Sequence, residues 1–234
     1  MAHVNRNQIK RLPARKGRPP KSKAAQVYAQ LKEALLLAKF RAGEVLSIRV
    51  LADALGTSTM PVREAITRLI TERALEPLPR RGVRVPILTA SQERDIYRVR
   101  YVLEGMASEL AAAAITDQEI GQLESYEAKL KSAIERQAIA EAHCANVQFH
   151  LTLYRASGAE ILIELIEAIY LRYAPSLYTV LDRLPVGNER RAAFVHTHHL
   201  AILDAARRRD PAGVRQALER DLSDAVGFNH LLPR

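Results

Sequence analysis

The fold is decided by one stretch, Leu46–Pro86, which reads LSIRVLADALGTSTMPVREAITRLITERALEPLPRRGVRVP. Its first part predicts a short helix between Ser47 and Gly56, because serine is a good N-cap and glycine a good C-cap. A second helix follows, with Ser58 as its N-cap and Pro61 in its first turn, where a missing N–H does no harm. Two short helices joined by a tight turn are typical of a helix-turn-helix.

The second predicted helix has an apolar face and a polar face. Its buried positions recur at helical spacing and are Val62, Ala65, Ile66 and Leu69. The outer face is left with Arg63, Thr67 and Arg68. Two β-like runs follow at 74–78 and 82–87, and Pro77 restricts the first run to a sheet edge. They enclose Pro79-Arg80-Arg81-Gly82, so we expect a basic hairpin, the wing, suited to phosphate or minor-groove contact. The alternative is a small α/β subdomain with a solvated charged loop.

Four short motifs lie in this stretch and just before it. They are Gly43-Glu44-Val45-Leu46, LADALG at 51–56, PVREA at 61–65 and RGVRV at 81–85. Together they resemble the signature of the GntR family of bacterial transcription regulators, which implies a winged helix-turn-helix DNA-binding domain over residues 24–86. The sequence departs from the family at Thr59, where arginine is frequent, and at Arg73, which replaces the glycine usually found before the wing.

Length, cysteine content and hydropathy limit the classes of protein to which this chain can belong. The chain has 234 residues and a formal net charge of +9, enough length for two modest domains. A single cysteine, Cys144, excludes a disulfide framework and fits a reducing compartment. No apolar run approaches the roughly 20 residues that span a bilayer, and the N-terminus has no signal-peptide pattern. We therefore expect a cytoplasmic protein with no membrane partner.

The first 23 residues carry most of the excess positive charge. They contain eight lysines and arginines and no acidic residue. Such an arm adds salt-sensitive affinity for DNA through counterion release. Residues 16–21, KGRPPK, are similar to the core of an AT-hook, which lies in the minor groove. The alternative is a disordered basic leader that only raises affinity.

From residue 90 onward the pattern predicts helices alone. We expect them at about 91–115, 117–134, 139–156, 160–181, 189–208 and 210–227. In the first, apolar residues recur every three or four positions and predict a buried stripe of Ile96, Val99, Leu103, Met106 and Leu110. Pro175 should kink or break the fourth helix. The expected fold is mainly α, with the winged domain followed by an all-α antiparallel bundle of six or seven helices.

Later blocks carry a second resemblance. They are YRVRYVLE at 97–104, Phe149-His150 followed by Ala156-Ser157-Gly158, and HLAIL at 199–203 followed by Asp210. Their order and spacing are similar to the ligand-sensing FCD domain of the FadR-type branch of the GntR family. The predicted organisation is a basic leader at 1–23, the winged domain at 24–86, a linker at 87–91, an effector-binding and dimerisation domain at 92–228 and a tail at 229–234.

A candidate metal site lies in the helical half. Asn146 and His150 are four residues apart and project from one helical face, and antiparallel packing can bring His199 and Asp221 to them. In the FCD domains that this half resembles, an Asp and three His hold a divalent metal; here Asn146 takes the Asp position and Asp221 the third His position. Such a set suits Zn²⁺, Ni²⁺ or Mn²⁺ and leaves positions for a ligand carboxylate. The alternative is a hydrogen-bonded polar cluster that binds an organic ligand without metal.

A candidate effector contact lies on the first bundle helix. Arg100 and Glu104 are also four residues apart. They form either an intrahelical ion pair or a site in which Arg100 grips a carboxylate bidentately. Tyr101 is a candidate lining residue beside them.

These features predict a homodimeric, ligand-responsive regulator of transcription, which the resemblance suggests is a repressor, active in a bacterial cytoplasm and at the nucleoid when bound to operator DNA. The expected DNA contacts are Arg49, Ser58, Thr59, Met60 and Arg63 in the major groove, with Arg81 and Gly82 at the minor groove. The effector would be a small carboxylate. Two other functions compete: a metal-dependent hydrolase or lyase in the helical domain, and a constitutive architectural DNA binder. The sequence has no HExxH motif and no nucleophile elbow, so we expect no enzyme.

Overall fold

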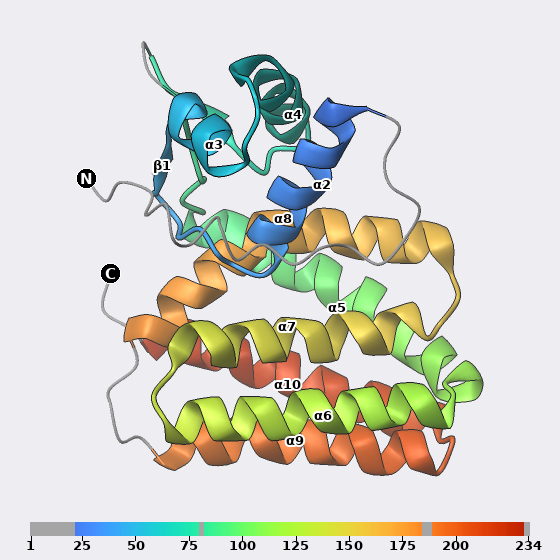
Figure 1. The fold of residues 1–234 in the computed structure, drawn as a ribbon. Coiled ribbons are helices and arrows are strands. Elements are labelled where there is room, and N and C mark those ends of the chain that lie inside the picture. Colours follow the sequence, from blue (N-terminus) through green and yellow to red (C-terminus); the bar gives the residue numbers. More distant parts are fainter. Residues whose placement is uncertain (1–21, 80–81, 184–188, 232–234) are drawn as a thin grey trace. The chain divides into compact units, whose positions relative to one another are not determined.

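The structure, a computed structural model, describes residues 22–79, 82–183 and 189–231 (Figure 1). It confirms the predicted class, with a winged helix-turn-helix followed by an all-helical part. Contacts divide the chain into two compact units. Unit 1 takes in the described residues up to Leu88 together with Tyr170–Thr179, and unit 2 takes in Thr89–Ile169 and the described residues from Val180.

Three helices form most of unit 1. They are α2 (Lys23–Leu36), α3 (Ile48–Ala54) and α4 (Thr59–Thr71). Ser22 caps α2 by accepting a hydrogen bond from the Ala25 amide, while Ser47 and Ser58 take the predicted N-cap positions in extended conformation. Both α2 and α3 pack against α4, whose predicted apolar stripe is buried. The core of this unit therefore fixes the direction of α4.

A small sheet completes unit 1. It has β1 (Val45–Leu46), β3 (Val83–Arg84) and β2 (Glu76–Pro77), in the antiparallel order β1-β3-β2. The predicted runs at 74–78 and 82–87 thus pair over two residues each, and Pro77 lies in an edge strand as expected. The first strand was not predicted, because a two-residue segment carries no period-2 signal.

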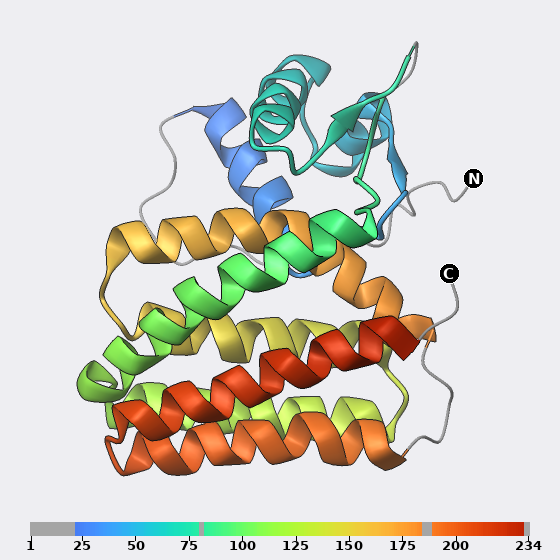
Figure 2. The same cartoon turned by 180° about the vertical axis from the view of Figure 1, so that it is seen from behind.

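Unit 2 is a helical bundle (Figure 2). Its helices are α5 (Ala90–Ala114), α6 (Asp117–Glu135), α7 (Ile139–Arg155), α8 (Glu160–Arg183), α9 (Glu189–Arg207) and α10 (Pro211–Leu231). Capping boxes at Thr89 and Thr116 begin α5 and α6. The neighbours are α6 with α7 and α9, α10 with α5 and α9, and α5 with α7. Pro175 was predicted to kink or break α8, which continues as one helix whose second part runs in a different direction from its first part (Figure 2). This helix also contributes Tyr170–Thr179 to unit 1.

The predicted buried stripe of α5 was wrong at three of its five positions. Val99, Met106 and Leu110 are exposed, as is Val102 at 64%. The buried face instead holds small and polar residues, among them Gly105, Ala107, Ser108 and Ala111. This face packs against α10 and α7. Because α5 is apolar on one face and tightly packed on the other, hydrophobicity alone pointed to the wrong face.

Candidate DNA-binding surface and metal centre

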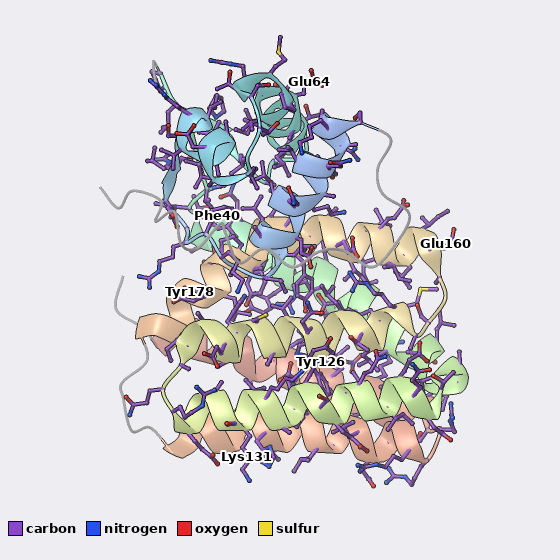
Figure 3. All side chains as sticks on the ribbon, viewed as in Figure 1. Phe40, Glu64, Tyr126, Lys131, Glu160 and Tyr178 are labelled. Carbon is purple, nitrogen blue, oxygen red and sulfur yellow. The ribbon has the colours of Figure 1, made fainter. Side chains whose placement is uncertain are left out.

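The start of α4 presents the predicted DNA-contacting side chains to solvent. Thr59, Met60 and Arg63 are exposed on α4, and Ser58 is exposed at its N-cap. Arg49 is exposed on α3. Figure 3 shows Glu64, the neighbour of Arg63, projecting from the outer side of the same helix. The surface therefore combines a guanidinium, hydroxyls and a thioether on a helix whose opposite face is buried.

The direction of α4 is also fixed by a polar contact with α2. The Tyr28 hydroxyl donates to Glu72, with Oη–Oε1 2.7 Å, and Arg68 Nε lies 3.1 Å from the same carboxylate oxygen. The Arg68 guanidinium also stacks 3.7 Å above the Tyr28 ring. Arg68 is exposed, as predicted for the outer face of α4, and from there it contacts Glu72 and the Tyr28 ring of α2.

Gly82, at the base of the wing, is required by the local backbone structure. Its φ is +74°, and a Cβ there would lie 2.5 Å from the Leu46 carbonyl oxygen. Only glycine fits a left-handed position that close to another backbone. Arg81, the other predicted wing contact, and the leader at 1–21 lie outside the described residues.

Three buried side chains meet inside unit 2. His150 comes from α7, His199 from α9 and Asp221 from α10, and one ligand atom from each lies within 4.8 Å of the others. The Nε2 atoms of the two histidines are 3.3 Å apart, and His150 Nε2 is 3.5 Å from Asp221 Oδ2. Asn146 is one turn before His150 on α7 and is half-buried. We call His150, His199 and Asp221 the histidine–aspartate site.

Both imidazole rings are held on their Nδ1 side. His199 Nδ1 is 2.6 Å from Glu127 Oε2 on α6, and His196 Nδ1 contacts the other oxygen of the same carboxylate. His150 Nδ1 is 3.2 Å from the hydroxyl oxygen of Tyr154. The Phe149 ring stacks on His199 with centroids 3.9 Å apart. Each ring therefore has a fixed plane and a fixed Nε2 direction.

Arg100 and Glu104 form the predicted intrahelical ion pair, so the guanidinium of Arg100 already binds a carboxylate of the protein. The pair is buried and bidentate, with Nε–Oε1 2.6 Å and Nη2–Oε2 3.2 Å. The Tyr154 hydroxyl adds a hydrogen bond to Glu104 Oε2 at 2.6 Å. Tyr101, the predicted lining residue, is 40% exposed, and burial together with the nearby Glu219 of α10 raises the pKa of its hydroxyl.

The pKa shifts at the histidine–aspartate site favour a bound cation. Burial lowers the pKa of His150 well below its usual value, and the charges of His199 and Arg100 add to this effect. Burial opposes the charged form of Glu127, but hydrogen bonds and charge from His199 and His196 outweigh it and lower its pKa. Burial raises the pKa of Asp221, against the attraction of His199, His198 and Arg100. A neutral imidazole is a competent ligand, and a buried carboxylate whose charge is costly favours a bound cation.

The donor set fits a divalent metal. Two imidazole nitrogens and a carboxylate oxygen converge from three helices, and all three residues are buried. Zn²⁺, Ni²⁺ and Mn²⁺ accept such ligands and keep positions open for an exogenous donor. The predicted His150, His199 and Asp221 are therefore brought together, and Asn146 lies one turn before His150 on the same helix.

Glu127 is the residue that the prediction missed. It occupies an apolar position on α6, in register with Ile120, Leu123 and Leu130, all of which are buried. An acidic residue within an apolar stripe was the available signal, because burying a carboxylate requires a partner.

Family models match both halves of the chain. The model described as "Bacterial regulatory proteins, gntR family" matches residues 23–85, and the model described as "FCD domain" matches residues 95–224. The chain belongs to the GntR family. It is an FCD-containing member, as the sequence blocks predicted.

Relatives of this GntR-family protein are transcription regulators. The HTH-type transcriptional regulator McbR of Escherichia coli K12 is 33% identical over 87% of this chain and 90% of its own length. The uncharacterized HTH-type regulator YdhC of Bacillus subtilis is 27% identical over 88% and 87%. The HTH-type transcriptional repressor RspR of E. coli K12 is 25% identical over 85% of each chain.

Solved structures agree with this assignment. E. coli McbR/YncC superposes with a TM-score of 0.81 at 30% identity, covering 90% of this chain and 98% of that one. A putative GntR regulator from Rhodococcus sp. RHA1 shares the fold, with a TM-score of 0.73 at 21% identity and coverage of 91% and 100%.

The GntR-family chain is thus a DNA-binding regulator of transcription. Its relatives are regulators rather than enzymes, which decides against the hydrolase or lyase alternative. Nothing in the comparisons favours a constitutive architectural binder. Among the residues that the structure describes, no helix combines the length and apolarity needed to cross a membrane.

Proposed function

We propose that this GntR-family protein is a homodimeric repressor in a bacterial cytoplasm. It binds double-stranded operator DNA through α3, α4 and the wing, and it responds to a small carboxylate held in the bundle through a divalent metal. One observation carries the DNA-binding part: the start of α4 exposes Thr59, Met60 and Arg63 while its other face is buried. A helix fixed on one side with a free guanidinium on the other suits insertion into the major groove.

Specificity is assigned chiefly to Arg63. Its guanidinium can donate two hydrogen bonds to O6 and N7 of guanine, and such a contact discriminates between bases by about 1–3 kcal/mol. We assign Arg49 and Ser58 to phosphate contacts, which position the protein without reading sequence. Thr59 and Met60 would meet base edges, and Arg81 and Gly82 the minor groove.

The dimer is proposed to form through an exposed apolar face of α5. Val99, Val102, Met106 and Leu110 recur along one side of a 25-residue helix and are exposed. An apolar face of this length is costly to leave in water. A second copy of this chain would cover it and would set the spacing of two DNA half-sites.

The effector is proposed to bind at the histidine–aspartate site. Arg100 is already held bidentately by Glu104, so a metal is the better anchor for an incoming carboxylate. Three protein ligands leave coordination positions open. The effector would bind more tightly to one spacing of the two winged domains than to another. It would then shift operator affinity by the difference between its two binding free energies.

Selection of bound sequences from a random DNA pool would first define the operator. Arg63→Ala should then bind it about 10- to 100-fold more weakly and lose discrimination at one base pair. Arg98→Ala is the matched control, because Arg98 is an exposed arginine of α5 paired with Asp95. Fluorescence anisotropy on operator and scrambled duplexes measures both effects. Equal operator affinity of Arg63→Ala and wild type would contradict the assignment.

A further inference from the structure

We propose that Glu127 is a positioning residue of the metal centre, and that Tyr154 has the same role for the second imidazole. Glu127 fixes the tautomer and direction of His199, and Tyr154 fixes those of His150. The inference rests on the proposed metal site and adds the residues that prepare it.

The contact of Glu127 determines the proton position on His199. The His199 Nδ1 atom lies 2.6 Å from Glu127 Oε2. A carboxylate oxygen accepts hydrogen bonds, so the Nδ1 atom carries the proton and donates it. In the neutral ring the Nε2 atom then has a free lone pair. Phe149, stacked 3.9 Å from this ring, keeps the lone pair in one plane.

Tyr154 determines the proton position on His150 by a similar argument. A tyrosine hydroxyl has one proton, and Tyr154 gives it to Glu104 Oε2 over 2.6 Å. Arg100 donates two further hydrogen bonds to that carboxylate. The Tyr154 oxygen, 3.2 Å from His150 Nδ1, is therefore the acceptor of an Nδ1–H. The Nε2 atom of His150 is left with a lone pair as well.

The two lone pairs face each other. The Nε2 atoms are 3.3 Å apart, and Asp221 Oδ2 lies 3.5 Å from the Nε2 of His150. Two acceptor nitrogens and an acceptor oxygen repel one another unless a cation lies between them. The hydrogen bonds on the far sides of the rings thus select the tautomers that bind metal. Partners of this kind commonly orient histidine ligands in metal sites.

The two positioning networks differ in net charge. Glu104 is neutralised by Arg100, so its network contributes direction but little net charge. Glu127 lies between two imidazoles, His199 and His196, and in the part of the chain that the structure describes its ion pairs are with these two rings. Together with Asp221 it supplies two negative charges, which match a divalent ion. Loss of the Glu127 charge should therefore weaken binding more than loss of the Tyr154 hydroxyl.

The test is a titration of the full chain with Co²⁺, followed by visible absorbance and calorimetry. Glu127→Gln should bind Co²⁺ about 10- to 100-fold more weakly than wild type, and Tyr154→Phe should show a smaller loss in the same direction. The visible bands of bound Co²⁺ should also shift in Glu127→Gln, because the His199 ring is no longer held. Glu127→Asp, which keeps the carboxylate, should recover part of the affinity.

Matched controls lie on the same helix. Glu124 is exposed and paired with Arg207, so Glu124→Gln should leave Co²⁺ affinity unchanged, as should Tyr126→Phe. His199→Ala removes a ligand and serves as the metal-free reference. Wild type that takes up no more Co²⁺ than His199→Ala would overturn the metal centre itself. Wild type that binds, with Glu127→Gln and Tyr154→Phe each within twofold of it, would overturn only the positioning role.

Discussion

The exposed start of α4 and the histidine–aspartate site place their functional residues in opposite ways. On α3 and α4, Arg49 and Arg63 lie 14 residues apart in sequence and point into solvent. In the bundle, His150, His199 and Asp221 come from three helices and are buried. The first surface can change its side chains without disturbing a core, whereas the second is part of the core. Substitutions in the first should alter binding alone, and those in the second should alter stability as well.

The largest effect should follow from Glu104→Ala in the bundle. It leaves the buried Arg100 guanidinium without its carboxylate, which should destabilise the protein by about 3–5 kcal/mol. Glu109→Ala is the control on the same helix, because the Glu109–Arg215 pair is exposed and water screens it, so its loss should have a much smaller effect. Urea unfolding followed by circular dichroism measures both. Similar losses of unfolding free energy in the two variants would contradict the proposed difference between buried and exposed ion pairs.

An intermediate effect should follow from Gly82→Ala in the winged unit. A Cβ there combines a left-handed backbone with a contact at 2.5 Å to Leu46 O, which should cost about 3 kcal/mol. Gly56 also has a positive φ, +61°, but a Cβ would meet nothing within 4 Å, so Gly56→Ala should cost only about 1 kcal/mol. Thermal unfolding distinguishes the two. Equal losses would show that the close approach at Gly82 relaxes freely, leaving DNA contact as its main role.

The smallest effect should follow from Arg73→Gly, and its sign should be opposite. Arg73 has φ 58° where the family usually has glycine, so the turn after α4 keeps a left-handed conformation that arginine adopts at a cost. Glycine removes about 1 kcal/mol of strain, and its freer unfolded chain offsets roughly half of this gain. We expect a net stabilisation of about 0.5 kcal/mol in urea unfolding. A destabilised variant would show that the arginine side chain contributes more than its backbone costs.

The accuracy of the sequence prediction differed between the two regions for a physical reason. The winged unit was predicted from caps, turn residues and local periodicity, which depend on neighbours within a few residues. On α5 the same reasoning chose the wrong face, because Gly105 and Ala107 pack against other helices while Val102 and Met106 stay outside. An apolar stripe marks one face of a helix, but it does not tell whether that face packs inside the bundle.

The sequence by itself determined the family, the order of the two units and three residues that meet in the histidine–aspartate site. Local motifs are sufficient for the first two, and the resemblance to FCD domains pointed to His150, His199 and Asp221. The tertiary structure alone decided that Glu127 holds the His199 imidazole and that Tyr154 contacts the buried Arg100–Glu104 pair in the core. The Glu127–His199 and Tyr154–Glu104 contacts join residues that are 72 and 50 positions apart in the chain, so helix packing, and no local rule, sets them.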